Sequence, residues 1–282
     1  RVGSTLGPPW WLSLPLLGVE VVLFVRFALF VVMSLPGARG VTPRGDEPEG
    51  DETPTVELLV PAAHAGRDEL SRTLALACRV GATSVRVLDR THRPEMQREA
   101  HRLGATYEVH DVAADRGPAG MVEAARGGST AELLAWIDAG DVVLPGFLEL
   151  ASNLVNPAGA RVAVVQSATD LVNSDSLLHL VPDRDDLAVE NKVVGPSLGR
   201  SGSAPWNGSG SIFRADALDA VGGLPPTSVS THRAAVRLAR AGWQVRWSTP
   251  PAVRTVAPDV LGEHLATVGA EAHGHFAALR SG

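Results

Sequence analysis

From Val56 onward, short apolar runs alternate with segments whose apolar residues recur at helical spacing. Short runs are typical of strands, and the second pattern is typical of helices that bury one face. The pattern predicts strands at 56–60, 84–88, 106–109, 132–137 and 161–166, and helices at 69–80, 94–103 and 145–154. Such alternation implies right-handed crossovers and a largely parallel sheet, so we expect an α/β domain. The strands at 56–60, 85–89 and 133–138 should be interior neighbours because they are so apolar.

One apolar run precedes this domain, over residues 10–35. Crossing a bilayer takes about 20 mostly apolar residues, and this run supplies them. Glu20 and Arg26 lie inside the run, and charges at such positions normally face other helices. We therefore expect a membrane-spanning helix that packs against helices of partner membrane proteins. The alternative is a buried core helix, for which the run is long; a secretory signal would be shorter.

Charge and composition around this run predict its orientation and its junction with the domain. Arg39 and Arg44 follow the run and only Arg1 precedes it, which favours an inner (plasma) membrane protein with its globular domain in the cytoplasm. Proline, glycine and acidic residues dominate 36–54, as in a flexible linker. The sequence thus predicts a membrane segment at 1–35, a linker at 36–54 and a domain at 55–282. Because it starts at an arginine and stops without an obvious ending, we expect a fragment whose further membrane helices lie outside it.

Composition excludes several classes of function. The formal net charge of -6 argues against a nucleic-acid partner, since such proteins usually present a basic face. A single cysteine, Cys78, excludes an internal disulfide and a cysteine-based zinc cluster. No Gly-x-Gly-x-x-Gly follows a predicted strand, so a Rossmann-type dehydrogenase is disfavoured. His273 and His275 lack a third ligand nearby in sequence and are more typical of surface residues.

Two aspartates follow predicted strands. Asp89 ends the strand at 84–88, and Asp138 ends the one at 132–137. In open α/β sheets, ligands bind beyond the carboxyl ends of the strands, so these carboxylates are candidates for one crevice. Aspartate also forms turns at strand ends, and that alternative stays open.

Several segments keep the pattern of one known family, in order and with nearly matching spacing. They are Pro54–Ala65, Val87–Met96, Asp138–Leu148 and Trp206–Leu218, followed by Gly242-Trp243. Over residues 54–276 the chain therefore resembles family-2 glycosyltransferases of the bacterial cellulose synthase type. The resemblance implies a GT-A fold: the Rossmann-like, mixed but mostly parallel sheet of nucleotide-diphospho-sugar transferases.

The resemblance also implies roles for individual residues. Asp89 would face the uracil base, and Asp138 would belong to the nucleotide-sugar site. The family's Asp-x-Asp holds Mg²⁺ or Mn²⁺ against the diphosphate; here Asp138 is kept and Gly140 replaces the second aspartate. Asp141 follows at once, so it is either a shifted metal ligand or a turn residue before the next helix. In the acceptor-binding region stand Gln166, Trp206, Gly208 and Ser209, where an aromatic ring beside glycine and a hydroxyl suits a sugar but also suits ordinary turn packing.

Other reactive positions of the family are replaced. The catalytic base position holds Thr231, which cannot accept a proton near neutral pH as a carboxylate does. Pro118 and Met121 take the places of a phosphate-contacting lysine and an asparagine. The polymer-holding Gln-x-x-Arg-Trp positions contain Thr267, Ala270 and Glu271.

Two functions of different classes follow. The first is a membrane-tethered glycosyltransferase with impaired catalysis, which would use Mg²⁺ or Mn²⁺, a UDP-sugar donor and a glycan acceptor. The second is a non-catalytic GT-A-like subunit of a membrane glycan-assembly complex. Replacement of the base favours the second, and the ancestry that the resemblance implies favours the first.

Overall fold

The computed structural model describes residues 14–34, 55–113, 116–155, 161–173, 184–227, 229–256 and 269. The chain separates into two compact units, Arg1–Ala38 and Arg39–Gly282. The predicted linker at 36–54, the Gln-x-x-Arg-Trp positions and both late histidines lie outside the described residues.

The first unit contains α1, Leu14–Ser34, a helix of 21 residues. Its large apolar side chains are exposed around the helix, for example Leu17 at 53%, Phe24 at 71% and Phe27 at 63%. Within the part of the chain that the structure describes, no helix has the length and apolarity needed to cross a membrane. The membrane span expected over 10–35 therefore stays a prediction.

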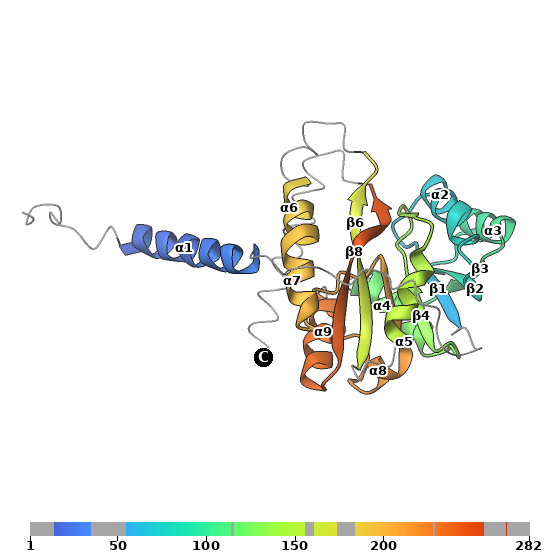
Figure 1. The fold of residues 1–282 in the computed structure, drawn as a ribbon. Helices are drawn as coiled ribbons and strands as arrows, with labels where there is room; N and C mark the ends of the chain where they lie inside the picture. The colour runs from blue at the N-terminus through green and yellow to red at the C-terminus, as the bar shows by residue number, and fades with distance from the viewer. Residues whose placement is uncertain are drawn as a thin grey trace, which may run out of the picture. The chain divides into compact units, whose positions relative to one another are not determined.

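The second unit is built on one eight-stranded sheet (Figure 1). The strand order is β3-β2-β1-β4-β7-β6-β8-β5. The strands are β1 Val56–Pro61, β2 Ser84–Asp89, β3 Thr106–Val109, β4 Leu133–Trp136, β5 Val142–Val143, β6 Val162–Leu171, β7 Ser211–Arg214 and β8 Gln244–Thr255. Strands β3, β2, β1 and β4 pair in parallel, as do β6 and β8, whereas β7 runs antiparallel to β4 and β6, and β5 to β8. The predicted interior neighbours β2, β1 and β4 are confirmed, within a mixed sheet.

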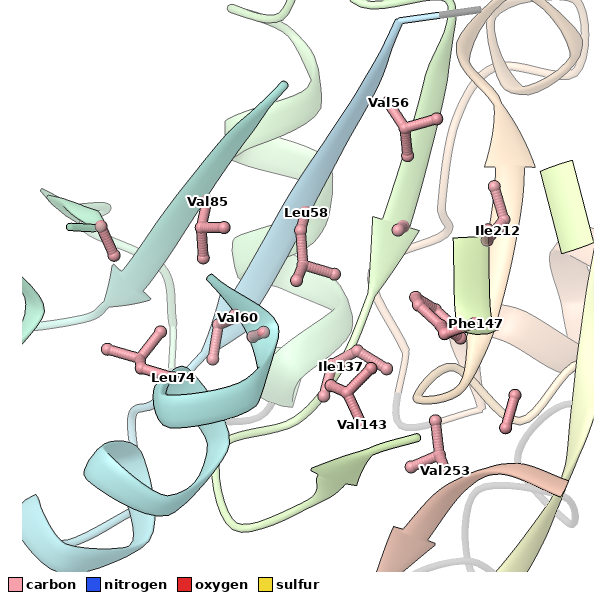
Figure 2. Packing of buried hydrophobic residues seen from close by; sticks show 14 of the residues in the cluster. Val56, Leu58, Val60, Leu74, Val85, Ile137, Val143, Phe147, Ile212 and Val253 are labelled. Atoms are coloured by element: carbon pink, nitrogen blue, oxygen red, sulfur yellow. The ribbon is translucent and has the colours of Figure 1, made fainter. Parts of the chain in front are cut away.

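Helices cover both faces of this sheet. They are α2 Arg67–Ala77, α3 Pro94–Leu103, α4 Gly117–Arg126, α5 Ser152–Val155, α6 Arg184–Val189, α7 Gly195–Arg200, α8 Ala215–Asp219 and α9 Ser230–Arg240, with a 3-10 turn at Phe147–Ala151 and a π-helical turn at Glu190–Val194. On one face, Leu74 of α2 packs in the same buried cluster as Leu58 and Val85 of the strands (Figure 2). A second buried cluster contains residues of α4, α8 and α9. Each face of the sheet is thus covered by its own apolar core. Polar side chains can therefore gather at the ends of the strands.

The prediction of one continuous helix at 145–154 is wrong. The segment forms the 3-10 turn Phe147–Ala151 and then only the short α5. Gly146 before it adopts a left-handed φ of 84°, which an α-helix cannot include. Phe147 and Leu150 are nevertheless buried, so the apolar spacing correctly identified the inward face.

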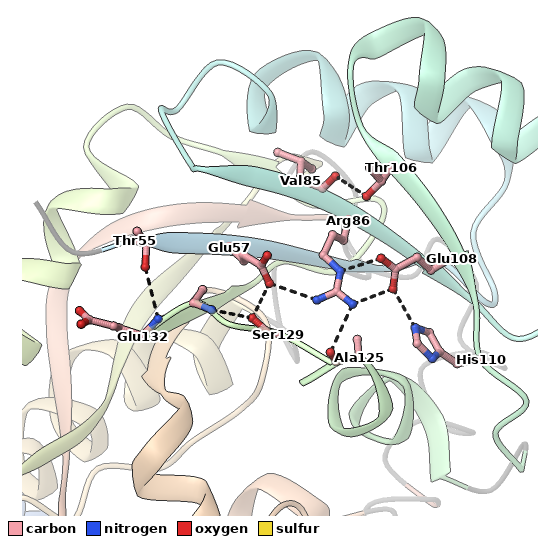
Figure 3. Close-up of polar contacts among 11 residues, drawn as sticks. Thr55, Glu57, Val85, Arg86, Thr106, Glu108, His110, Ala125, Ser129 and Glu132 are labelled. Atoms are coloured by element: carbon pink, nitrogen blue, oxygen red, sulfur yellow. Dashed lines mark hydrogen bonds and ion pairs between the residues drawn. The ribbon is translucent and has the colours of Figure 1, made fainter. Parts of the chain in front are cut away.

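A partly buried ion-pair network joins strands β1, β2 and β3 and fixes α4 against them (Figure 3). The Arg86 guanidinium on β2 donates to Glu108 at 2.7 Å and to Glu57 at 3.1 Å. It also donates to the Ala125 carbonyl in the last turn of α4, at 3.3 Å. A cation at a helix C-terminus complements the helix dipole, so this contact stabilises α4 as well as the strands.

A second network joins α2 to α3 through Glu99, which is 2% exposed. Hydrogen bonds from Arg102, and then from Ser71, lower the pKa of Glu99 to about 2, below its ordinary value of 4.5. Arg67 contributes a further hydrogen bond from α2. A carboxylate with a lowered folded-state pKa stabilises the fold above its unfolded pKa, and this contribution is lost as pH falls through the folded value.

We predict that Glu99→Gln lowers the free energy of unfolding at pH 7 by about 1 kcal/mol, because both arginines are largely exposed and solvent screens them. The difference from the unmodified chain should shrink between pH 4.5 and pH 2. Urea unfolding across this pH range measures it. Glu132→Gln, at an exposed position, is the control and should show no such change. A difference that stays constant with pH would contradict the assigned ionic role.

Candidate functional site

The carboxyl end of β4 leads into a tight turn that contains both Asp138 and Asp141. The Asp141 N–H donates to the Asp138 carbonyl at 3.1 Å, which closes the turn. Gly140 within it has a φ of 113°, a conformation that side chains disfavour. The backbone conformation therefore favours glycine at 140, and the next carboxylate in the turn is that of Asp141.

The turn is held against α2 by Thr73. The Thr73 hydroxyl donates to the Asp141 carbonyl at 2.7 Å and accepts from the Gly140 N–H at 2.9 Å. Thr73 is fully buried, so these bonds are shielded from water. Sequence patterns assigned Thr73 only to a buried helix face. A hydroxyl among apolar neighbours is the signal that could have identified it, since buried polar groups need partners.

Both carboxylates accept hydrogen bonds from the protein, Asp138 from Trp136 and Asp141 from Ser209 and Thr255. The Trp136 ring N–H donates to Oδ1 of Asp138 at 2.7 Å. The Ser209 hydroxyl donates to Oδ2 of Asp141. The same hydroxyl oxygen accepts from the Asp138 N–H at 3.0 Å. Trp136 and Ser209 therefore orient the two acidic side chains, a role that the sequence did not predict for either.

Burial makes negative charge costly at this turn. Desolvation, together with the charge of Asp141, raises the pKa of Asp138 to about 7, against the hydrogen bond from Trp136. Desolvation also raises the pKa of Asp141, and hydrogen bonds from Ser209 and Thr255 oppose this. A bound cation would relieve the repulsion, because an opposite charge favours the ionised form.

The donor set fits a hard divalent cation that is shared with a ligand. Mg²⁺ is usually held by one or two carboxylates plus substrate phosphates rather than by a complete protein cage. Asp138 and Asp141 supply two carboxylates, and across the described ranges no group of three or more His, Cys, Asp or Glu could hold a metal. Such an ion would need its remaining oxygens from water or from a diphosphate.

The loop with Trp206, Gly208 and Ser209 packs tightly beneath this turn. Gln166 on β6 is fully buried; its amide donates to the Ser209 carbonyl at 2.8 Å and accepts from the Asn207 N–H at 3.0 Å. Trp206 is also fully buried and donates to the Ser211 hydroxyl at 3.0 Å. At Gly208 a Cβ would lie 3.1 Å from the Trp136 ring.

These positions bear on the expected acceptor-sugar contacts. With Trp206 and Gln166 at 0% exposure, their side chains have no surface on which a sugar could lie. In this structure both side chains pack in the core, and their expected role toward an acceptor sugar stays a prediction. Ser209 is partly exposed, but its hydroxyl is committed to the turn at Asp138 and Asp141.

Asp89 lies at the end of β2 in a separate network. It is 1% exposed and forms an ion pair with Arg93 at 2.7 Å. Its carboxylate also accepts from the Tyr107 hydroxyl at 2.8 Å and from the Arg90 N–H at 2.8 Å. Burial raises the pKa of Tyr107 to about 12, so the phenol remains a donor at neutral pH.

Asp89 and Asp138 thus share one edge of the sheet, with β1 between their strands, but not one set of partners. Arg93 also donates to the carbonyls of Ala62 and Ala65, so the pair fixes the loop that follows β1. The role of Asp89 toward a nucleotide base stays a prediction.

The family's base position lies in the first turn of α9. Thr231 is 7% exposed there and carries no carboxylate. Met121, in place of the expected asparagine, is fully buried in the core beneath α4. Both side chains are thus buried, and the loss of reactive groups at these two positions stays a prediction.

Comparison with known proteins agrees with this architecture. Residues 133–267 match the family model described as glycosyl transferase family group 2. The chain is similar to the structure of mannosyltransferase PcManGT from Pyrobaculum calidifontis in complex with GDP-Man and Mn²⁺, with 17% identity over 94% of this chain and 73% of that chain and a TM-score of 0.62. The fold is GT-A-like.

Two further structures support the same fold. One is glucosyl-3-phosphoglycerate synthase from Mycobacterium tuberculosis with Mn²⁺ and UDP-glucose, at 16% identity over 76% of this chain and 75% of that chain, TM-score 0.51. The other is S. aureus TarS 1-349 with UDP, at 12% identity over 72% of this chain and 60% of that chain, TM-score 0.52. The chain has no significant sequence match to a curated protein. The expected family-2 resemblance is confirmed for residues 133–267, and the cellulose-synthase-type subfamily stays a prediction.

Proposed function

We propose that the domain binds a nucleotide-diphosphate sugar together with Mg²⁺ or Mn²⁺ at the turn of Asp138 and Asp141. The carrying observation is the pair of partly or fully buried carboxylates that one turn aligns at the carboxyl end of β4. A cation there would offset their mutual repulsion and would be offset in turn by a diphosphate. The similar structures in complex with Mn²⁺ and GDP-Man or UDP-glucose support this choice of ligand.

When bound, the cation would neutralise charge that develops on a diphosphate leaving group. The chain's own residues would hold the donor: Asp138 and Asp141 through the metal, and Asp89 as a candidate contact to a uracil base. We infer a UDP-sugar as donor and a glycan as acceptor from the resemblance to cellulose-synthase-type enzymes. The proposed acceptor site has less support than the proposed donor site, because the side chains of Trp206 and Gln166 are buried.

We further propose that sugar transfer is impaired. A positioned base typically contributes about 10²–10⁴-fold to a rate, and Thr231 cannot supply it. A preorganised electrostatic partner contributes on the order of 10²–10³-fold, and Pro118 removes one cation of the family pattern. These factors do not multiply, because groups that act together are not additive.

The alternative is a non-catalytic subunit of a membrane glycan-assembly complex. Replacement of the base favours it, because Thr231 carries no carboxylate. Both proposals require binding of the nucleotide sugar at the turn of Asp138 and Asp141, and they differ in whether the sugar is transferred.

Binding is tested by calorimetry with UDP-glucose, with and without Mn²⁺. We predict binding that requires the metal and is weakened at least about 10-fold by Asp138→Asn or Asp141→Asn, since each removes a negative charge that would contact the cation. Asp219→Asn is the matched control, an exposed aspartate on α8 at the opposite edge of the sheet, and should bind as the unmodified chain does. Equal binding in all variants would contradict the site.

Turnover is tested by release of UDP from UDP-glucose and UDP-N-acetylglucosamine. We predict a rate near the uncatalysed background for the unmodified chain, and an increase with Thr231→Asp, which restores a carboxylate to the base position. Thr231→Asn fills a similar volume without a base and is the control. Robust turnover by the unmodified chain would show that another acid has replaced the base and that catalysis is intact.

Membrane tethering is part of the same proposal. We infer that the apolar run at 10–35 anchors the chain in the inner membrane with the domain in the cytoplasm. Glu20 and Arg26 would then face helices of partner membrane proteins. The exposed apolar side chains around α1 support an apolar environment for that helix.

Tethering predicts that the full chain stays with membranes after an alkaline wash. A Leu17→Asp, Phe24→Asp variant should be released, because a charge at the centre of a span costs about 2.5–3.5 kcal/mol. Val236→Asp, at an exposed valine of α9, should remain bound. Release of the unmodified chain would refute the anchor.

A further inference from the structure

The single hydroxyl of Ser209 forms hydrogen bonds with two residues of the turn that contains Asp138 and Asp141. Its oxygen accepts from the Asp138 N–H at 3.0 Å, and its hydrogen goes to Oδ2 of Asp141. A hydroxyl has one hydrogen to donate, so the first bond fixes the direction of the second. Ser209 is 68 residues from Asp141 in sequence, and the contact therefore depends on the tertiary fold.

The loop that carries Ser209 is itself rigid. The Ser209 carbonyl accepts from Gln166, and the Gly210 N–H donates to the Trp136 carbonyl at 2.9 Å. The Ser167 N–H in turn donates to the Gly210 carbonyl at 2.9 Å. Strands β4 and β6 thus hold the loop from both sides, and the hydroxyl is presented by a fixed backbone.

The opposite carboxylate is held in the same manner. Trp136 donates to Oδ1 of Asp138, and among the described residues no hydrogen-bond donor reaches Oδ2 of Asp138. One oxygen of Asp138 is therefore held by protein while the other is left for a ligand. Residues that hydrogen bond to metal ligands orient them, and their loss typically lowers metal affinity about 10–100-fold.

We propose that Ser209 is a positioning residue for the metal ligand Asp141, rather than a contact to the acceptor sugar. It aligns Asp141 with Asp138 and so allows an Asp-Ala-Gly-Asp turn to do what an Asp-x-Asp pair does in the resembled family. This inference rests on the proposed metal site. It also explains why a hydroxyl in the expected acceptor region points to the turn.

The test measures Mn²⁺ binding to the full chain in detergent and in the presence of UDP, with electron paramagnetic resonance as the readout. We expect Ser209→Ala to weaken Mn²⁺ binding about 10–100-fold. Ser209→Thr keeps the hydroxyl and should restore most of the affinity. Ser84→Ala is the matched control: it removes a serine hydroxyl that is buried without a partner at the start of β2, and should leave Mn²⁺ binding unchanged.

A double-mutant cycle separates positioning from a general loss of packing. If Ser209 acts through Asp141, Ser209→Ala should add little in an Asp141→Asn background but keep its effect on Mn²⁺ binding beside Asp219→Asn. An equal effect in both backgrounds, or Mn²⁺ affinity unchanged by Ser209→Ala, would overturn the inference while leaving the metal site intact. Absence of Mn²⁺ binding by the unmodified chain would instead refute the proposed function on which the inference rests.

Discussion

Two carboxylates close to each other at the end of a buried strand repel, and burial strengthens the repulsion. Asp138 and Asp141 meet this condition at the carboxyl end of β4, where burial, and then the charge of Asp141, raise the pKa of Asp138 to about 7. Keeping both groups near each other requires fixed donors around them. Trp136, Ser209 and Thr73 supply these donors from three separate parts of the chain. The free-energy cost of placing two carboxylates close together in a buried turn is understandable if a divalent cation completes the site.

The surrounding architecture is organised to hold that turn. Parallel strands β2, β1 and β4 bring their carboxyl ends to one edge, where ligands bind in open α/β sheets. The antiparallel β7 follows the loop of Ser209 and pairs with β4, with Ser211 opposite Trp136. The loop therefore lies beside the turn that follows β4. The Arg86 network holds α4 against the sheet, and Glu99 joins α3 to α2, the helix whose Thr73 contacts the turn. Thr231, at the base position that the resemblance assigns, lies outside this turn, at the start of α9.

Much of the sheet could be predicted from sequence, because burial on both faces leaves continuous apolar runs in the parallel strands. The helix at Pro94–Leu103 was predicted with its bounds, since proline begins it and Gly104 ends it. Asp138 could be identified as a strand-end carboxylate. The roles of Thr73 and Ser209 could not, because both contact Asp141 across 68 residues of sequence, and no local pattern encodes such a contact. For Trp206 the sequence leaves two roles open, because an aromatic residue beside glycine is compatible both with a sugar contact and with packing in the core.

The central claim is that Asp138 and Asp141 form one divalent-cation site for a nucleotide-diphosphate sugar. Anomalous scattering from crystals grown with Mn²⁺ and UDP-glucose locates the metal without reference to activity. The account predicts one Mn²⁺ ion between the two carboxylates, with diphosphate oxygens completing its coordination and Ser209 still bonded to Asp141. Mn²⁺ bound elsewhere on the domain, or UDP-glucose bound with no metal at this turn, would contradict it.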